Sequence, residues 1–193
     1  AEGAADLYRR LIAEYPASEL VGSAWKDLGL VYKSVDRLDE AITALMQVDQ
    51  GFATWPKVQA EAADMLLAAG RLDEIDNKLQ LATALQVAAA AGDDESVAEL
   101  HYVLGRVARE SGDYGGELEH FSRTLEATDN GDLASFARFF RGIAHYQSGA
   151  ALDAVGDSLS GGEHFQESVT DLEGVLAAGG SAEMRLVAFR TRG

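Results

Sequence analysis

One stretch decides the fold: residues 23–48 read SAWKDLGLVYKSVDRLDEAITALMQV. Within it Trp25, Leu28 and Tyr32 follow one another at spacings of three and four residues, which places them on one face of a helix. After a short polar turn the apolar period of about 3.6 residues restarts at Leu38. The stretch therefore predicts two consecutive helices joined by a tight turn.

The same stretch resembles a tetratricopeptide repeat, a helix–turn–helix unit of about 34 residues. The resemblance is carried by the pattern W-x2-L-G-x2-Y, which ends at Tyr32, and by the small residue Ala41 nine positions later. Gly29 and Ala41 are small at positions where the two helices approach closely. The resemblance implies an all-α fold, a right-handed α-solenoid of antiparallel helix pairs in which each pair buries its apolar face against its neighbours.

The pattern recurs at the expected period. Residues 70–74 (GRLDE) match residues 36–40 (DRLDE) with a shift of 34 positions, and Pro56 suits the first turn of a helix. We expect the second helix of this second unit to run unbroken from about Arg71 to Ala91. The chain then reads as a single array: a broken unit over 1–21, full units over 22–55, 56–97, 98–134 and 135–178, and a broken unit over 179–193.

The segment 150–162 has two interpretations. It is either an ordinary second helix interrupted at the Ser-Gly-Gly of 160–162, or an insertion followed by a helix that begins at Glu163. We favour the insertion, because the apolar stripe after Glu163 is better formed. Residues 181–192 would then start a fifth unit, and the chain would be a piece of a longer protein.

Composition narrows the functional classes. The formal net charge of −16 argues against general nucleic-acid binding and against adhesion to an anionic membrane. The absence of cysteine excludes disulfides, thiol catalysis and zinc–cysteine sites. No run of apolar residues is long enough for a membrane-spanning helix. We therefore expect a chain without direct membrane insertion, whose acidity serves mainly solubility.

Candidate catalytic and metal-binding groups are scattered. Four histidines, His101, His120, His145 and His164, lie in different units, and no two of them have the i, i+4 spacing of a metal site on one helix face. The acidic clusters fall at turns and in first helical turns, where they cap helices. The sequence predicts no metal, no cofactor and no enzymatic activity.

The family resemblance supplies the candidate binding surface, because a set of first-helix positions lines the concave face of tetratricopeptide arrays. Carried over to this sequence, those positions hold five cations against three anions. Aromatic side chains follow in the last two full units. The predicted partner-binding residues are Lys26, Lys33, Lys57, Tyr102, Arg106, Arg109, Phe136, Phe139 and Tyr146.

The family resemblance implies a non-enzymatic protein-interaction scaffold. These residues suggest that it binds a protein or peptide partner, with an acidic segment suited to its cations. The Lys-Asn clamp of chaperone adaptors is missing, because Lys26 is followed by Leu30 at the clamp position. Two alternatives stay open: a subunit that self-associates through its broken terminal repeats, and a regulatory domain of a larger protein. The phrase LYRRLIAEYPASE over 7–19 is similar to repeats of bacterial envelope proteins, which leaves periplasm, envelope and cytoplasm all open.

Overall fold

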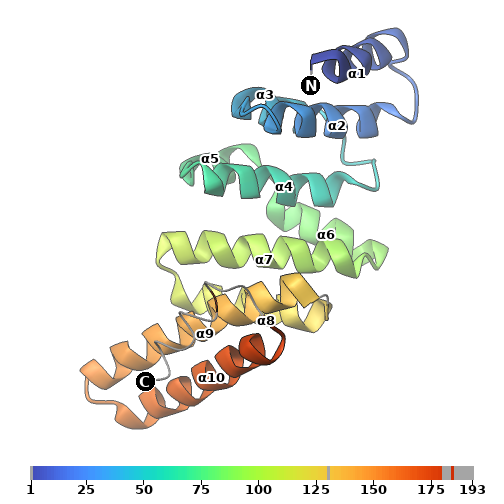
Figure 1. The fold of residues 1–193 in the computed structure, drawn as a ribbon. Helices are drawn as coiled ribbons and strands as arrows, with labels where there is room; N and C mark the ends of the chain where they lie inside the picture. The colour runs from blue at the N-terminus through green and yellow to red at the C-terminus, as the bar shows by residue number, and fades with distance from the viewer. Residues whose placement is uncertain (1, 130, 180–183, 185–193) are drawn as a thin grey trace. The chain divides into compact units, whose positions relative to one another are not determined.

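The computed structural model describes residues 2–129, 131–179 and 184, and every regular element in that part of the chain is an α-helix (Figure 1). The helices are α1 Glu2–Glu14, α2 Val21–Lys33, α3 Leu38–Leu45, α4 Trp55–Ala68, α5 Asp73–Lys78, α6 Leu81–Ala91, α7 Asp94–Ser111, α8 Tyr114–Ala127, α9 Gly131–Ala154 and α10 Ser158–Ala177. The predicted start of a fifth unit over 181–192 lies outside the described residues, apart from Met184.

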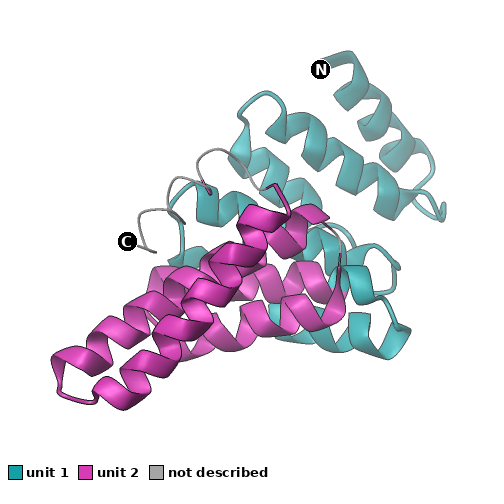
Figure 2. Cartoon of the chain, turned by 60° about the horizontal axis from the view of Figure 1, so that its bottom comes forward, with its two compact units in different colours: residues 1–96 teal, residues 97–193 magenta. Residues whose placement is uncertain are grey.

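The chain divides into two compact units, residues 1–96 and 97–193 (Figure 2). In unit 1, α2 packs against both α1 and α3, and α4 packs against α3, α5 and α6. In unit 2, α9 packs against α8 and α10. Neighbours in sequence are therefore neighbours in space, as repeat folds require.

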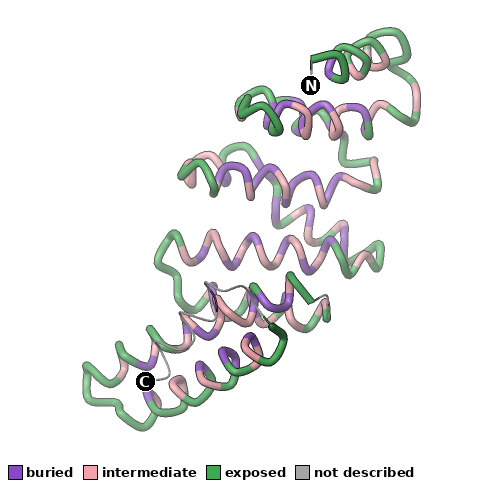
Figure 3. Tube along the Cα trace, in the orientation of Figure 1, coloured by how far each residue is buried: buried purple, intermediate pink, exposed green. Residues whose placement is uncertain are grey.

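Apolar faces of these helices form the core. In α2, α3 and α4 the buried positions recur every three or four residues, which gives the striped tubes of Figure 3. Leu28, Leu45 and Leu66 are almost fully buried. Trp25 differs from its predicted companions Leu28 and Tyr32, because it is only half-buried and lines a surface cavity. The buried tryptophan of unit 1 is Trp55.

One backbone device ends the first helix of four successive pairs. Asp36, Gly70, Gly112 and Gly156 each have a positive φ, between 57° and 87°. This left-handed conformation ends a helix and lets its last carbonyls find partners. The second helix then begins within two or three residues, so the turn length repeats along the chain.

The second predicted repeat, residues 56–97, departs from the prediction of one unbroken helix over 71–91. Leu79 is extended, and it separates α5 from α6. The break is stabilised from outside, because the backbone N–H of Gln80 donates to the side-chain oxygen of the buried Gln59 in α4 at 2.8 Å. A hydrogen bond across helices therefore replaces the helical one at this point.

The third and fourth helix pairs, α7–α8 and α9–α10, share a register of 44 residues. His101-Tyr102 corresponds to His145-Tyr146, and His120-Phe121 corresponds to His164-Phe165. Gly112 and Gly156 occupy the same turn, and the following Asp113 and Asp157 both cap the second helix by accepting from a backbone N–H three residues on. In this register α9 begins about two helical turns earlier than its counterpart α7, and α10 ends about two helical turns later than its counterpart α8.

This lengthening corrects the expected insertion over 150–162. The segment forms the end of α9, a short turn and the start of α10, which begins at Ser158 instead of Glu163. Gly161 does not break the helix; it is buried, and a Cβ there would lie 3.0 Å from the Gly149 carbonyl oxygen. Gly161, one of the two glycines that suggested an interruption, instead lets α9 and α10 approach closely.

Candidate functional site

The strongest candidate surface is an aromatic cluster in unit 2. Tyr102 of α7 lies 6.5 Å from Phe136 and 6.3 Å from Phe140 of α9, measured between ring centroids. Phe139 packs edge-on against Phe140 at 5.3 Å. The buried Phe121 of α8 stacks on Phe140, with 5.6 Å between ring centroids, and forms the buried side of the cluster. Phe136 stays 42% exposed, so the cluster presents an apolar face to solvent.

Two arginines of α7 border the aromatic cluster. The Arg106 guanidinium lies 5.8 Å from the Tyr102 ring centroid, and that of Arg109 lies 5.0 Å from the Phe140 ring centroid. Such cation–π contacts hold a positive charge beside an apolar surface. Arg109 also pairs with Glu117 of α8 at 3.3 Å. Arg106, Tyr102 and Phe136 are therefore the predicted site residues that this unit brings together most directly.

Glu117 is an unusual partner for Arg109. Its side chain is fully buried, and its Oε2 has no hydrogen-bond partner among the described residues. Burial raises the pKa of Glu117, which the Arg109 charge opposes. The pair fixes Arg109 against α8 and takes part of its charge away from any partner.

The predicted cations of unit 1 lie on its first helices. Lys33 of α2 pairs with Glu61 of α4 at 3.5 Å, and Lys57 of α4 pairs with Glu95 at 2.9 Å. Lys26 makes no ion pair with any residue that the structure describes. Side chains from successive first helices thus meet, but acids neutralise two of the three lysines.

Tyr146 is separate from the aromatic cluster. Its ring packs against Phe165 of α10, with 5.7 Å between centroids. This contact repeats that of Tyr102 with Phe121, at 5.9 Å and the same 54° tilt, one 44-residue register earlier. Sequence reasoning grouped Tyr146 with Phe136 and Phe139, whereas the described contacts do not bring it to them.

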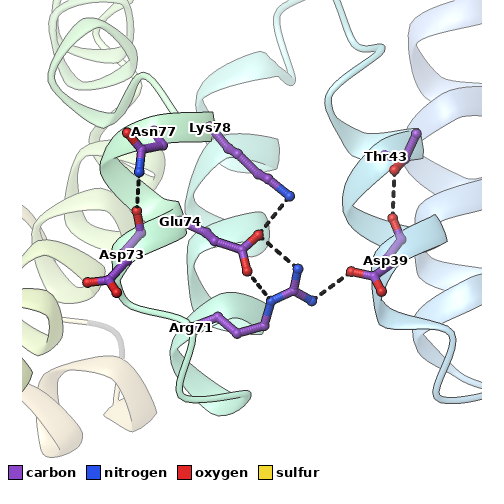
Figure 4. Close-up of polar contacts among 7 residues, drawn as sticks. All are labelled: Asp39, Thr43, Arg71, Asp73, Glu74, Asn77 and Lys78. Atoms are coloured by element: carbon purple, nitrogen blue, oxygen red, sulfur yellow. Dashed lines mark hydrogen bonds and ion pairs between the residues drawn. The ribbon is translucent and has the colours of Figure 1, made fainter.

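A polar cluster in unit 1 links one repeat to the next (Figure 4). The Arg71 guanidinium grips the Glu74 carboxylate with two hydrogen bonds, and its third nitrogen donates to Asp39 of α3 at 2.7 Å. Lys78 adds an ion pair to Glu74 at 2.7 Å. Arg71 and Lys78 lower the pKa of Glu74 to about 2. Each of these four charged side chains has a partner of opposite charge. We therefore interpret this Arg71 cluster as a structural contact that joins α3 to α5.

Unit 1 also has a surface cavity of about 350 Å³ between α1, α2 and α3. Trp25, Leu28 and Ala44 give it an apolar wall, and Arg9 stands at its edge. Arg9 donates to the Tyr32 hydroxyl at 2.7 Å, which holds the guanidinium in place. The cavity is large enough for one apolar side chain of a partner.

The histidines form two pairs. The Nδ1 atoms of His101 and His120 are 3.1 Å apart, and those of His145 and His164 are 2.9 Å apart. Each pair joins the first and second helix of one hairpin. Burial lowers the pKa of His120 and His145, and burial together with the nearby His120 lowers that of His101 to about 4. His101, His120 and His145 therefore favour the neutral form, and at each short contact one Nδ1–H donates to the other Nδ1.

Sequence reasoning missed both pairs, because it searched for histidines on one helix face. The partners are 19 residues apart and lie on antiparallel helices. The available signal was the dipeptide His-Tyr followed by His-Phe, repeated after 44 residues. Among the described residues no group of three or more His, Cys, Asp or Glu side chains gathers where it could hold a metal ion.

Two further findings concern the described helices and known proteins. None of these helices is both long enough and apolar enough to cross a membrane. No protein-family model matches the sequence, and no curated protein matches it either.

Solved structures of MamA are similar to this chain. The crystal structure of MamA has a TM-score of 0.57 at 18% identity, over 89% of this chain and 88% of that chain. The MamA RS-1 ArsTM double mutant has a TM-score of 0.50 at 14% identity, over 89% of this chain and 96% of that chain. At these identities the likeness establishes the fold, a tetratricopeptide-like helical-repeat solenoid. The all-α solenoid of antiparallel helix pairs that the sequence predicted is thereby confirmed.

Proposed function

We propose that this chain is a non-enzymatic protein-interaction scaffold that binds an acidic, partly apolar segment of another protein along its first helices. One observation carries the proposal: α7 and α9, the first helices of neighbouring pairs, bring the half-buried Tyr102 and Arg106 together with the exposed Phe136. An exposed aromatic side chain beside a guanidinium is the usual composition of an interaction hot spot. The repeat fold shared with MamA supports the same class of function.

The pairing of the lysines refines this proposal. Lys33–Glu61 and Lys57–Glu95 are solvent-exposed ion pairs, and such pairs contribute about 0–1 kcal/mol. A carboxylate of the partner can therefore replace Glu61 or Glu95 at small cost. At the aromatic cluster of unit 2, affinity comes mainly from the aromatic side chains, while Arg106 favours acidic over basic partners.

A peptide library tests this function. Random peptides displayed on phage are selected on the immobilised chain, and one enriched peptide is synthesised. We expect acidic residues beside an aliphatic or aromatic one in the enriched peptides. The synthetic peptide should bind the variant Phe136→Ala/Arg106→Glu at least about tenfold more weakly, because truncating a hot-spot residue typically costs about 2 kcal/mol or more. Its affinity for the parent should fall as salt rises.

Tyr114→Ala is the matched control, because Tyr114 is an exposed aromatic residue on α8, a second helix. It should leave the affinity unchanged. Enrichment of basic peptides, or equal loss of binding in the control and the test variant, would refute the proposed surface.

Self-association is a second candidate function. Large apolar side chains are exposed at one end of unit 1, where Leu7 is 66% and Leu20 is 60% accessible. A second copy that covered these side chains would remove apolar surface from water. The broken terminal repeats expected from the sequence would expose Leu7 and Leu11 at one end of the chain and Leu186 and Phe189 at the other. Leu11 is half-buried, and Leu186 and Phe189 lie outside the described part of the chain.

A further inference from the structure

The two histidine pairs are the most regular chemical feature that the scaffold function does not use. Both pairs join antiparallel helices, both place Nδ1 opposite Nδ1, and their ring centroids are 5.3 and 5.2 Å apart. The rings are tilted by 37° and 43°, so neither pair is stacked face to face. Packing between two helices does not by itself require an imidazole at any of these four positions.

We propose that each histidine pair is a binding site for a divalent transition-metal ion of borderline softness, such as zinc, nickel or copper. The ion would bind the two facing Nδ1 atoms and so clamp α7 to α8 in one site and α9 to α10 in the other. This inference is independent of the proposed partner-binding surface.

The separation of the nitrogen atoms suits a shared ion. Two imidazole nitrogens bound to one zinc at about 2.0–2.1 Å, with an angle of about 90–110° between them, are about 2.9–3.4 Å apart. The observed separations of 3.1 and 2.9 Å fall in this range. Binding requires each ring to rotate, so that both lone pairs turn from each other toward a common ion.

The protons also balance. In the metal-free pair one ring carries its proton on Nδ1 and donates it to the other ring. When the ion binds, that proton leaves Nδ1, and the same ring takes up a proton at Nε2. The ring stays neutral, so the site loses no net proton.

Charges around the two sites are alike. Asp113, Glu119, Glu126 and Arg123 act on the first pair, and Asp171, Glu167 and Arg141 act on the second. Acids therefore outnumber bases around each pair, which favours a cation. Because only two protein ligands are present, water fills the remaining positions, which suits ions with a strong preference for imidazole over those that prefer oxygen.

Calorimetric titration tests the proposal. The chain, free of any affinity tag and stripped with a chelator, is titrated with nickel and separately with zinc in millimolar magnesium, which occupies the acidic surface. We expect two equivalents to bind the parent. His120→Asn should bind one equivalent, and His120→Asn/His164→Asn none. Zinc should raise the melting temperature of the parent but not that of the double variant.

Asparagine is the matched replacement, because its amide lies near the position of Nδ1 and can keep the hydrogen bond to the facing histidine. Circular dichroism without metal checks that the fold is retained. If a variant unfolds, nitrogen-15 spectra of the parent decide the matter, since zinc must shift the Nδ1 resonances of the pairs. Equal binding by the parent and the double variant, no binding by the parent, or unshifted Nδ1 resonances would each overturn the proposal.

Discussion

At the scale of single residues, Gly29 sets the distance between α2 and α3. A Cβ on this residue would lie 2.7 Å from Leu45 Cδ2 and 3.1 Å from the Ala41 carbonyl oxygen. Real side chains do not tolerate the first distance, and the second atom belongs to the backbone, which cannot rotate away. The sequence predicted this close approach correctly from the two small residues, Gly29 and Ala41.

Gly29→Ala should therefore lower the free energy of unfolding by about 1–3 kcal/mol, and Gly29→Leu by more, because both overpack the helix interface. Gly162→Ala is the control: Gly162 lies in the second turn of α10, and a Cβ there meets nothing within 4 Å. It should raise stability by about 0.5–1 kcal/mol, since alanine is the better helix former. Urea unfolding of the three variants measures both effects, and a neutral Gly29→Leu would mean that the helices are not this close.

At the scale of elements, sequence reasoning succeeded where a helix is defined by its own residues. The bounds of α2 and the N-terminal proline of α4 agree with the prediction. Sequence reasoning failed where contacts with another helix determine whether a helix breaks or continues. The break between α5 and α6 depends on the Gln59 side chain of α4, and the continuity of α10 through Gly161 depends on the close backbone of α9. Neither partner can be read from the local sequence.

The Arg71 cluster gives α5 a pH dependence. The pKa of Glu74 is lowered from 4.5 to about 2 by Arg71 and Lys78, so the folded chain favours the ionised form. The stabilisation is therefore present above about pH 4.5 and is lost as the pH falls toward 2. Glu74→Gln should be less stable than the parent at pH 7, and the difference should vanish near pH 2.

Urea unfolding at several pH values measures this difference. Glu126→Gln removes one partner of the exposed Arg123–Glu126 pair in α8 and serves as the control, with little effect at pH 7. A difference between parent and Glu74→Gln that stays constant from pH 7 to pH 2 would show that folding does not lower the pKa of Glu74.

At the scale of the whole molecule, the exposed apolar end of unit 1 makes oligomeric state the informative property. We expect the average mass by light scattering to rise with concentration for the parent. Leu7→Glu/Leu20→Glu should remain monomeric, because it places charge on that face. Val155→Glu, at an equally exposed apolar site in unit 2, should behave like the parent. A parent that stays monomeric at all concentrations would leave partner binding as the remaining function.

The candidate site could be predicted only in part. The sequence and the family resemblance selected Tyr102, Arg106 and Phe136, which the structure brings together. The acids that neutralise Lys33 and Lys57 come from neighbouring repeats, so only the fold shows them. The histidine pairs were visible as repeated dipeptides, but their meaning depends on the antiparallel packing of two helices.

The shared register of the last two helix pairs bears on how such a chain can change its length. Unequal crossing-over between the two His-Tyr coding sequences would remove one whole period of 44 residues. The new seam would fall inside a helix, yet the helical phase would continue across it, and His101 would face His164 through the same hairpin. The reverse exchange would add a complete hairpin with its turn, cap and histidine pair. Genes of this kind can therefore gain or lose one module in a single event without passing through a misfolded intermediate length.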